Sequence, residues 1–258
     1  MGESMSIQIP MQAKGAWNKD TIISMNTLKK GQVFRAQTIT ELQRRQGTSE
    51  ERRGRAGNAA SNERSSMPGQ MSVPPLVRPI SKGQKVVLSL TGSASLVDVR
   101  LGWNRTDSRC DVDVSVFLLG ENGKVIGDDW FVFYGQTKSP DGSTVFEMDG
   151  VQDREVIRLD LDRLNTAVKK IVFVLTINEA FEKKLHFGML KDAYIRILNH
   201  KDQNELVSFS MTDYYTNVIS MMIGELYLHN GSWKFHGIGN GVAKDLAGLC
   251  GLYGVQVS

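Results

Sequence analysis

The sequence predicts a mainly β fold, an antiparallel β-sandwich of two sheets with a few short helices, preceded by a largely disordered N-terminal extension. Three observations lead to this fold class. Runs of alternating apolar and polar residues recur after Ser81, turn signals separate them at short intervals, and helical periodicity is scarce. This pattern is typical of two packed antiparallel sheets and argues against a parallel α/β sheet.

The first 75 residues differ in composition from the rest of the 258-residue chain. Five of the six prolines lie within the first 79 residues, whereas only two of the 20 aromatic side chains precede Trp103. A segment so poor in core-forming side chains buries little apolar surface. We therefore predict a basic extension over residues 1–75, with marginal helices over 18–46 and disorder elsewhere, and a folded domain over 76–258.

Each expected strand is an apolar or alternating run bounded by turn-forming residues. The runs fall at residues 85–90, 96–103, 111–119, 130–134, 144–148, 156–161, 170–177, 192–198, 206–209, 223–228 and 232–238. Two Asn-Gly pairs, Asn122-Gly123 and Asn230-Gly231, predict tight hairpin turns. Short helices are expected at 162–168, 179–185 and 242–252, and the glycine-rich segment 237–241 is expected to turn the chain into the last of them.

Charge and cysteine content argue against several classes of protein. The net charge is +3, too small to indicate a nucleic-acid-binding protein, although residues 1–75 hold 11 basic against six acidic side chains. Cys110 and Cys250 provide neither a disulfide framework nor zinc-ligand spacing. The sequence has no apolar run long enough to span a membrane and no signal peptide at its start. We expect a cytoplasmic protein.

Acidic side chains gather between residues 104 and 155. Asp111 and Asp113 are two residues apart in an expected strand and so share a face, while Asp149, Asp153 and Glu155 lie in or beside a loop. Neighbouring carboxylates repel one another unless a proton or cation neutralises them, and hard oxygen ligands favour Ca²⁺ or Mg²⁺. Two interpretations are open: a cation site, if the fold brings the loop beside the strand, or a solvated strand face that also includes Ser115.

Several segments are similar to the TerD family, the tellurium-resistance and general-stress proteins of bacteria. They are LGWN from Leu101, DVDVS from Asp111, FVFY from Phe131, DRE from Asp153, KIVFV from Lys170, GELY from Gly224 and WKF from Trp233, in continuous order within residues 76–258. The resemblance implies a two-sheet sandwich and a Ca²⁺ site built by clustered acidic loops. Transferred to this chain, that site would comprise Asn104, Asp111, Asp113, Asp149, Asp153 and Glu155.

Three positions depart from the family's pattern. Asn104 stands where the family has an Asp after Gly-Trp, and Arg109 and Arg154 stand where it has carboxylates. These changes remove negative charge, on which Ca²⁺ affinity depends, so we expect weaker binding than in a typical member. Alternatively, Arg109 and Arg154 pair with Asp111 and Glu155, and salt bridges replace the ion.

No set of residues in the sequence predicts catalysis. The four histidines are scattered, and no nucleophile elbow precedes a helix. Together with the resemblance, this predicts a stress-response and tellurium-resistance protein, a non-enzymatic Ca²⁺-binding or interaction module whose partners are other stress-response proteins. The alternative is a metal-independent scaffold whose basic tail docks on a membrane, a nucleic acid or an acidic partner.

Overall fold

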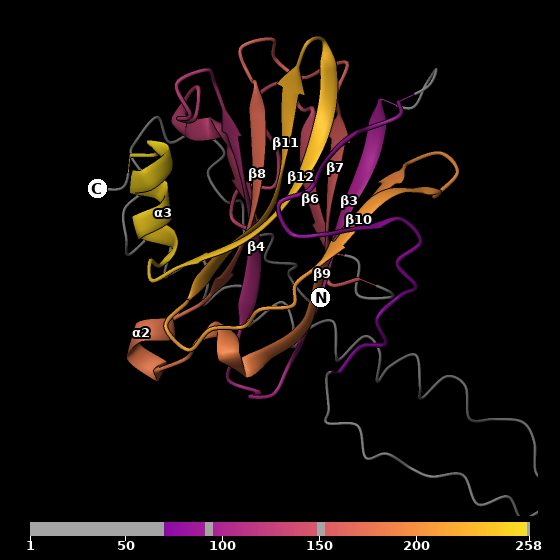
Figure 1. Cartoon of the computed structure of the whole chain (residues 1–258). Coiled ribbons are helices and arrows are strands. Elements are labelled where there is room, and N and C mark those ends of the chain that lie inside the picture. The colour runs from indigo at the N-terminus through magenta and orange to yellow at the C-terminus, as the bar shows by residue number, and fades with distance from the viewer. Residues whose placement is uncertain (1–69, 91–94, 149–152, 257–258) are drawn as a thin grey trace, which may run out of the picture.

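The computed structural model describes residues 70–90, 95–148 and 153–256, and their strands form two sheets of six that face each other (Figure 1). Sheet I contains, in spatial order, β1 (Pro79–Ile80), β10 (Glu205–Ser210), β9 (Leu190–Asn199), β3 (Leu96–Arg105), β7 (Glu155–Asp160) and β6 (Thr144–Met148). Sheet II contains β2 (Lys85–Val87), β12 (Ser232–Val242), β11 (Ser220–His229), β8 (Lys170–Ile177), β4 (Val112–Leu119) and β5 (Phe131–Phe133). The predicted sandwich is confirmed, with one addition: β1 and β10 pair in parallel. The extension expected over residues 1–75 lies outside the described residues up to Gly69.

The main core fills the space between the two sheets. Alternate residues of each strand face it, as the period of two in the sequence predicts. The inward-facing side chains of two of these strands are Val97, Val99 and Leu101 from β3 and Val112, Val114, Val116 and Leu118 from β4. Their burial in one cluster fixes the register of both strands, because a shift by one residue would turn polar neighbours inward.

A second core covers the outer face of sheet II. Helix α3 (Leu246–Tyr253) lies against this face, where Leu249 and Cys250 pack in one cluster with Phe117 of β4 (Figure 1). Asp113 and Ser115 share the outer face of β4 and are only 5% and 1% exposed. The interpretation of this face as solvated is therefore wrong, because sheet II is covered on both sides.

Two of the three predicted helices are present in part. Helix α2 (Ala180–Lys183) lies within 179–185, and α3 begins four residues after the predicted start at 242. Residues 162–168 form turns instead. The N–H of Asn165 donates to Asp141 Oδ2 and its side chain accepts from the Ala167 N–H, and such local side-chain bonds compete with a helix.

The glycine-rich segment 237–241 does not turn the chain but continues β12, where Gly241 pairs with Met221. The predicted turn is therefore wrong. These glycines are explained by close packing, since a Cβ at Gly241 would come within 2.5 Å of Val218 and one at Gly237 within 2.9 Å of Phe209. Two 3₁₀ turns that the sequence did not predict, η1 (Asp128–Trp130) and η2 (Phe187–Met189), precede β5 and β9.

The two Asn-Gly pairs behave differently. Asn230 and Gly231 join β11 to β12 with φ angles of 50° and 72°, both positive as a tight two-residue hairpin requires, so that prediction is confirmed. Asn122 and Gly123 also turn the chain, but only a single bridge, from Leu119 to Val125, follows them. No second strand forms there before β5.

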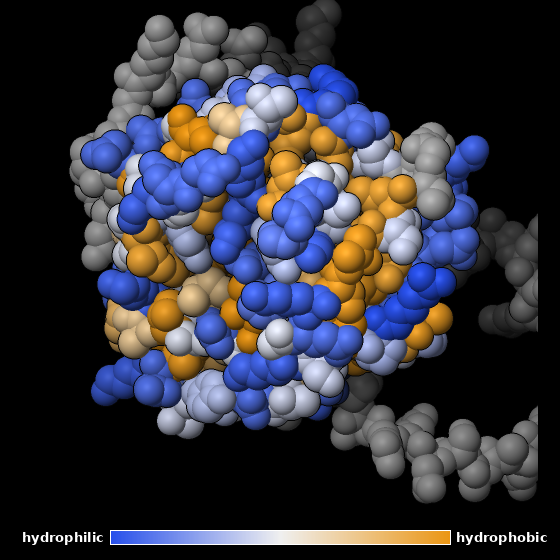
Figure 2. Space-filling model, turned by 45° about the horizontal axis from the view of Figure 1, so that its top comes forward, coloured by the Kyte–Doolittle hydropathy of each residue, from blue (hydrophilic) through white to orange (hydrophobic). Residues whose placement is uncertain are grey.

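The surface mixes hydrophilic and apolar side chains on the face shown in Figure 2. The most exposed apolar residues lie on separate elements, with Val77 ahead of β1 and Phe181 in α2. Across the described ranges, no helix is both long enough and apolar enough to span a membrane.

Candidate functional site

Three of the predicted cation ligands, Asp111, Asp113 and Glu155, act electrostatically on the side chain of Tyr134. Asp113 is in β4, Asp111 just precedes that strand, and Glu155 begins β7 in the facing sheet. Burial raises the pKa of Tyr134 far above its ordinary value, and the charges of Asp113, Asp111 and Glu155 raise it further. All three carboxylates therefore lie within the electrostatic range of Tyr134.

The end of a neighbouring strand explains how Glu155 enters this site. Strand β5 pairs with β4 only from Ser115 to Phe117. The N–H of Val114 therefore lies beyond the last paired residue of β5. Glu155 Oε2 accepts a hydrogen bond from this N–H at 2.8 Å. The carboxylate thus takes the place of a strand and ties the edge of sheet II to sheet I.

Asp113 belongs to a polar row on the outer face of sheet II. Thr176 of β8 is its direct neighbour, and Ser220 of β11 is the next along the row. Ser220 Oγ donates to the backbone oxygen of Lys244 at 2.6 Å. The segment that leads into α3 is therefore fixed over this row, which accounts for the burial of its polar side chains.

The three carboxylates offer the hard oxygen donors that Ca²⁺ prefers, but they do not complete a site on their own. Ca²⁺ takes roughly six to eight oxygen ligands, and no group of three or more His, Cys, Asp or Glu side chains in the described ranges is arranged to hold a metal. The predicted ligand Asp149 lies outside the described residues. Met148, the last described residue before it, pairs with Glu155.

Asp153 lies in a different place and has different partners. It is fully buried and accepts hydrogen bonds from the Tyr194 hydroxyl at 2.7 Å and from Arg196 Nη2 at 2.6 Å, with Arg100 Nη1 3.4 Å away. Tyr194 reaches it by crossing Gly102, where any Cβ would come within 2.3 Å of the ring. The structure therefore places Asp153 in an ion-pair network of sheet I and not with the other three carboxylates.

Asn104 is also removed from the carboxylates. It is 4% exposed, its Oδ1 accepts from the Met71 N–H at 2.8 Å, and its Nδ2 donates to the Met71 oxygen at 2.9 Å and to Asp192 Oδ2 at 3.0 Å. Only an amide provides an acceptor and two donors in this arrangement. Asn104 thus holds the chain ahead of the sandwich against sheet I.

The two arginines that stand where the family has carboxylates differ in their partners, and only for Arg109 does the observed ion pair differ from the predicted one. Arg109 pairs with Asp107 at 2.6 Å, and this hydrogen bond lowers the pKa of Asp107 to about 2. The predicted pairing of Arg109 with Asp111 is therefore wrong. Arg154 donates from Nε to the Trp103 oxygen at 2.6 Å and places its guanidinium 5.5 Å from the centre of the Trp103 ring.

Comparison with known proteins decides the family. A family model described as TerD domain matches residues 77–253. The chain belongs to the TerD family. It is 42% identical to tellurium resistance protein TerD of Alcaligenes sp and 40% identical to that of Serratia marcescens, in both cases over 69% of this chain and 98% of the relative. It is 37% identical to general stress protein 16U of Bacillus subtilis (strain 168), over 69% of this chain and 97% of the relative.

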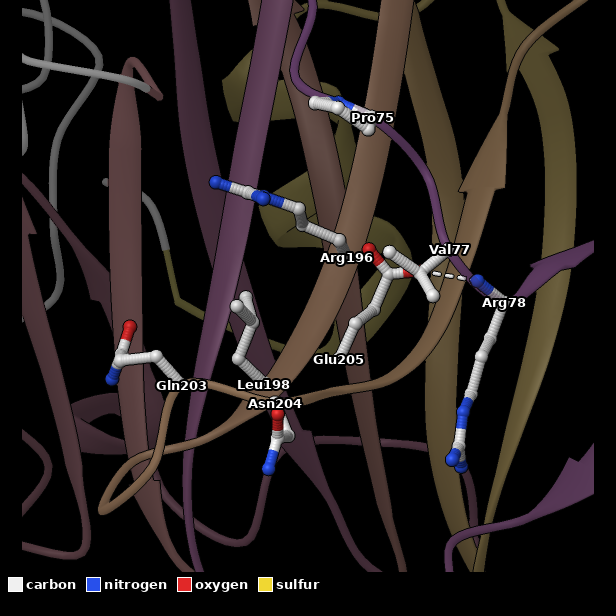
Figure 3. Close-up of a pocket in the computed structure, with 8 residues that line it drawn as sticks. All are labelled: Pro75, Val77, Arg78, Arg196, Leu198, Gln203, Asn204 and Glu205. Carbon is white, nitrogen blue, oxygen red and sulfur yellow. Dashed lines mark hydrogen bonds between the residues drawn. The ribbon is translucent and has the colours of Figure 1, made fainter.

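Two features of this TerD-family chain were not predicted. One is a strap, residues 71–78, which runs along sheet I and leads into β1; Figure 3 shows part of it above β9 and β10. The other is an ion-pair network in which the nearly buried Asp98 contacts His200, Gln203 and Arg158. Burial acts to raise the pKa of Asp98, but the hydrogen bonds of Gln203 and His200 and the nearby positive charges lower it overall. Alternation marks Asp98 as outward-facing, but no local pattern identifies its partners, which come from other strands.

Proposed function

We propose that this protein is a non-enzymatic stress-response and tellurium-resistance protein that binds Ca²⁺ weakly through Asp111, Asp113 and Glu155, with Asp149 as a further ligand. The observation that carries the proposal is the bond from the Val114 N–H to Glu155 Oε2 at 2.8 Å, which brings Glu155 from sheet I to the strand that carries Asp113. Neighbouring like charges are stabilised by a cation, and hard oxygen donors select Ca²⁺ over softer metals.

The expectation of weak binding rests on the two ligands that have other partners. Asn104 binds Met71 and Asp192, and Asp153 binds Tyr194 and arginine side chains. A site without them has fewer oxygen ligands and less negative charge, and Ca²⁺ affinity depends on both.

The buried state of both thiols supports a role without catalysis and a reducing, cytoplasmic location. Cys110 and Cys250 are free and buried. Burial raises the pKa of both thiols, that of Cys250 to about 12, which disfavours the thiolate that a nucleophile needs.

Calorimetric titration of the full chain with CaCl₂ tests the cation site. We expect heat of binding and a rise in melting temperature at millimolar Ca²⁺. Both should be lost in Asp113→Asn and retained in Asp129→Asn, whose carboxylate is exposed in η1. Absence of both effects in the unmodified protein, or equal binding by Asp113→Asn, contradicts the proposal.

A metal-independent interaction module is the second candidate. It is favoured because Asn104 and Asp153 bind protein groups, Met71 and Arg196. In this function the sandwich presents the strap and the preceding basic extension to partner proteins of the stress response. Growth on tellurite separates the two candidates: resistance retained by a folded Asp113→Asn variant favours the interaction module, and resistance lost favours the cation site.

A further inference from the structure

The strap is held against sheet I at both ends. At one end Met71 is bound by Asn104, with bonds of 2.8 and 2.9 Å. At the other end the Arg78 N–H donates to Glu205 Oε1 at 2.7 Å, and the Arg78 oxygen accepts from the Ser208 N–H at 2.9 Å. The strap between these points therefore lies at a defined place on the sheet.

A pocket with a volume of about 430 Å³ lies between the strap and strands β9 and β10. This volume is in the range of small-ligand sites, which hold about 300–1,000 Å³. Figure 3 shows the lining residues, which are Pro75, Val77, Arg78, Arg196, Leu198, Gln203, Asn204 and Glu205. The lining combines apolar surface with a few polar groups, as ligand sites do.

Glu205 has an unsatisfied oxygen at this pocket. Its side chain is 8% exposed, and Oε1 is used by the Arg78 N–H. Its second oxygen, Oε2, is buried and has no hydrogen-bond partner within the described part of the chain. Leaving a buried carboxylate oxygen without a donor is unfavourable, so the site is suited to a group that supplies N–H and positive charge.

The other charged and amide groups around the pocket already have partners or lie apart. Arg196 donates to Asp153 at 2.6 and 3.1 Å, and Gln203 donates to Asp98 at 3.0 Å. In Figure 3 the guanidinium of Arg78 points away from the Glu205 carboxylate. Among the described residues, no ion pair is formed by Glu205. The unpartnered Oε2 of Glu205 therefore favours a ligand group that brings N–H donors and a positive charge.

We propose that this pocket binds a small primary ammonium compound. Its N–H groups donate to Glu205 Oε2, and its apolar part lies against Pro75, Val77 and Leu198. Because Oε2 is closed off from water, a ligand in the pocket reaches it only when the chain around Glu205, which includes the strap at Arg78, moves aside. Ligand binding is thereby linked to the position of the strap and of the chain that precedes it.

Titration of the ¹⁵N-labelled full chain with n-butylammonium chloride tests this site. The probe should shift the Arg78 amide signal in a saturable way, because that N–H donates to Glu205. The uncharged n-butanol and the anionic butyrate should not. Glu205→Gln keeps an oxygen for the Arg78 N–H but replaces the other oxygen with a donor, so we expect affinity to fall about tenfold or more. Glu121→Gln, an exposed change in a turn, should bind as the unmodified protein does.

Several outcomes would overturn the proposal. Absence of a saturable shift shows that the pocket does not bind an ammonium group. Equal binding by Glu205→Gln, or by n-butanol, shows an apolar surface without recognition of charge. The same Arg78 shift with CaCl₂ assigns the pocket to an inorganic cation. Asp113→Asn should retain ammonium binding, so failure of this proposal is distinguishable from failure of the Ca²⁺ proposal.

Discussion

Replacement of Asn104 by Asp measures how firmly the strap is held. The substitution restores the family's acid after Gly-Trp but removes both Nδ2 bonds, to the Met71 oxygen at 2.9 Å and to Asp192 Oδ2 at 3.0 Å. It also sets a new carboxylate at the buried position 104 against the carboxylate of Asp192, which is exposed. Taking about 1 kcal/mol for the neutral bond and about 2 kcal/mol for the bond to a charged group, we expect a loss of about 3 kcal/mol. For a domain of this size that is a fall in melting temperature of roughly 6–12 °C.

Urea unfolding at pH 7 and at acidic pH provides the measurement. The like-charge pair raises the folded-state pKa of one carboxyl above its unfolded value. The pair therefore costs stability at neutral pH, and the deficit shrinks as the pH falls through that raised pKa and one oxygen becomes a donor. The control is Asn122→Asp, an exposed site whose oxygen accepts from the Lys124 N–H and is kept by the change. A stability at pH 7 within about 0.5 kcal/mol of the unmodified protein would refute the reasoning, since changes of that size are ordinary for surface sites.

Two further substitutions test the network on sheet I. Gly102→Ala places a Cβ 2.3 Å from the Tyr194 ring, so the ring must move. We expect the free energy of unfolding in urea to fall by about 2–4 kcal/mol. The NMR order parameter of the Tyr194 side chain should also fall. Asp98→Asn removes a carboxylate whose pKa is lowered in the folded state, mainly by bonds from Gln203 and His200 against the opposing effect of burial. We expect a loss of about 1–3 kcal/mol at pH 7, because the stabilisation is present above the unfolded pKa and disappears as the pH falls through the lower folded value.

Matched variants separate these effects from general damage. Gly251→Ala is in α3 with no atom near the added Cβ, so it should stabilise by up to about 1 kcal/mol. Asp162→Asn changes an exposed carboxylate and should leave the free energy of unfolding almost unchanged. A Gly102→Ala variant as stable as Gly251→Ala would contradict the close packing of Tyr194 on Gly102. A loss of stability in Asp98→Asn that stays constant down to pH 3 would contradict the dependence of stability on the ionised Asp98.

Local patterns in the sequence were sufficient to predict strands but not the surface that each strand meets. The alternation in β4 correctly identified Val112, Val114 and Val116 as core residues. It could not show that Asp113 and Ser115 are buried too, because the segment bound over this polar row at Lys244 comes more than 100 residues later. The helix predicted at 162–168 failed for a related reason, since Asp141 in a distant turn binds the backbone there.

Sequence position brought together residues that the structure gives separate partners. The grouping of Asp111, Asp113 and Glu155 as cation ligands stays a prediction; the structure shows Glu155 bonded to the backbone of β4, the strand that carries Asp113. Asn104 and Asp153 were assigned to the same site by their position in a motif, yet each binds groups from distant parts of the chain, Met71 and Arg196. Sequence spacing limits which residues can share a face, but it does not show which strand or strap lies opposite.

Sheet II has a consequence for the order in which this protein forms. Every strand of that sheet precedes α3 in the chain, so during synthesis the face that carries Phe117 emerges from the ribosome before its cover does. An apolar strand face in that condition is open to association with other chains. The nascent protein therefore exposes this apolar face until Leu249 and Cys250 pack against it. We expect folding to depend most on chaperones during that interval.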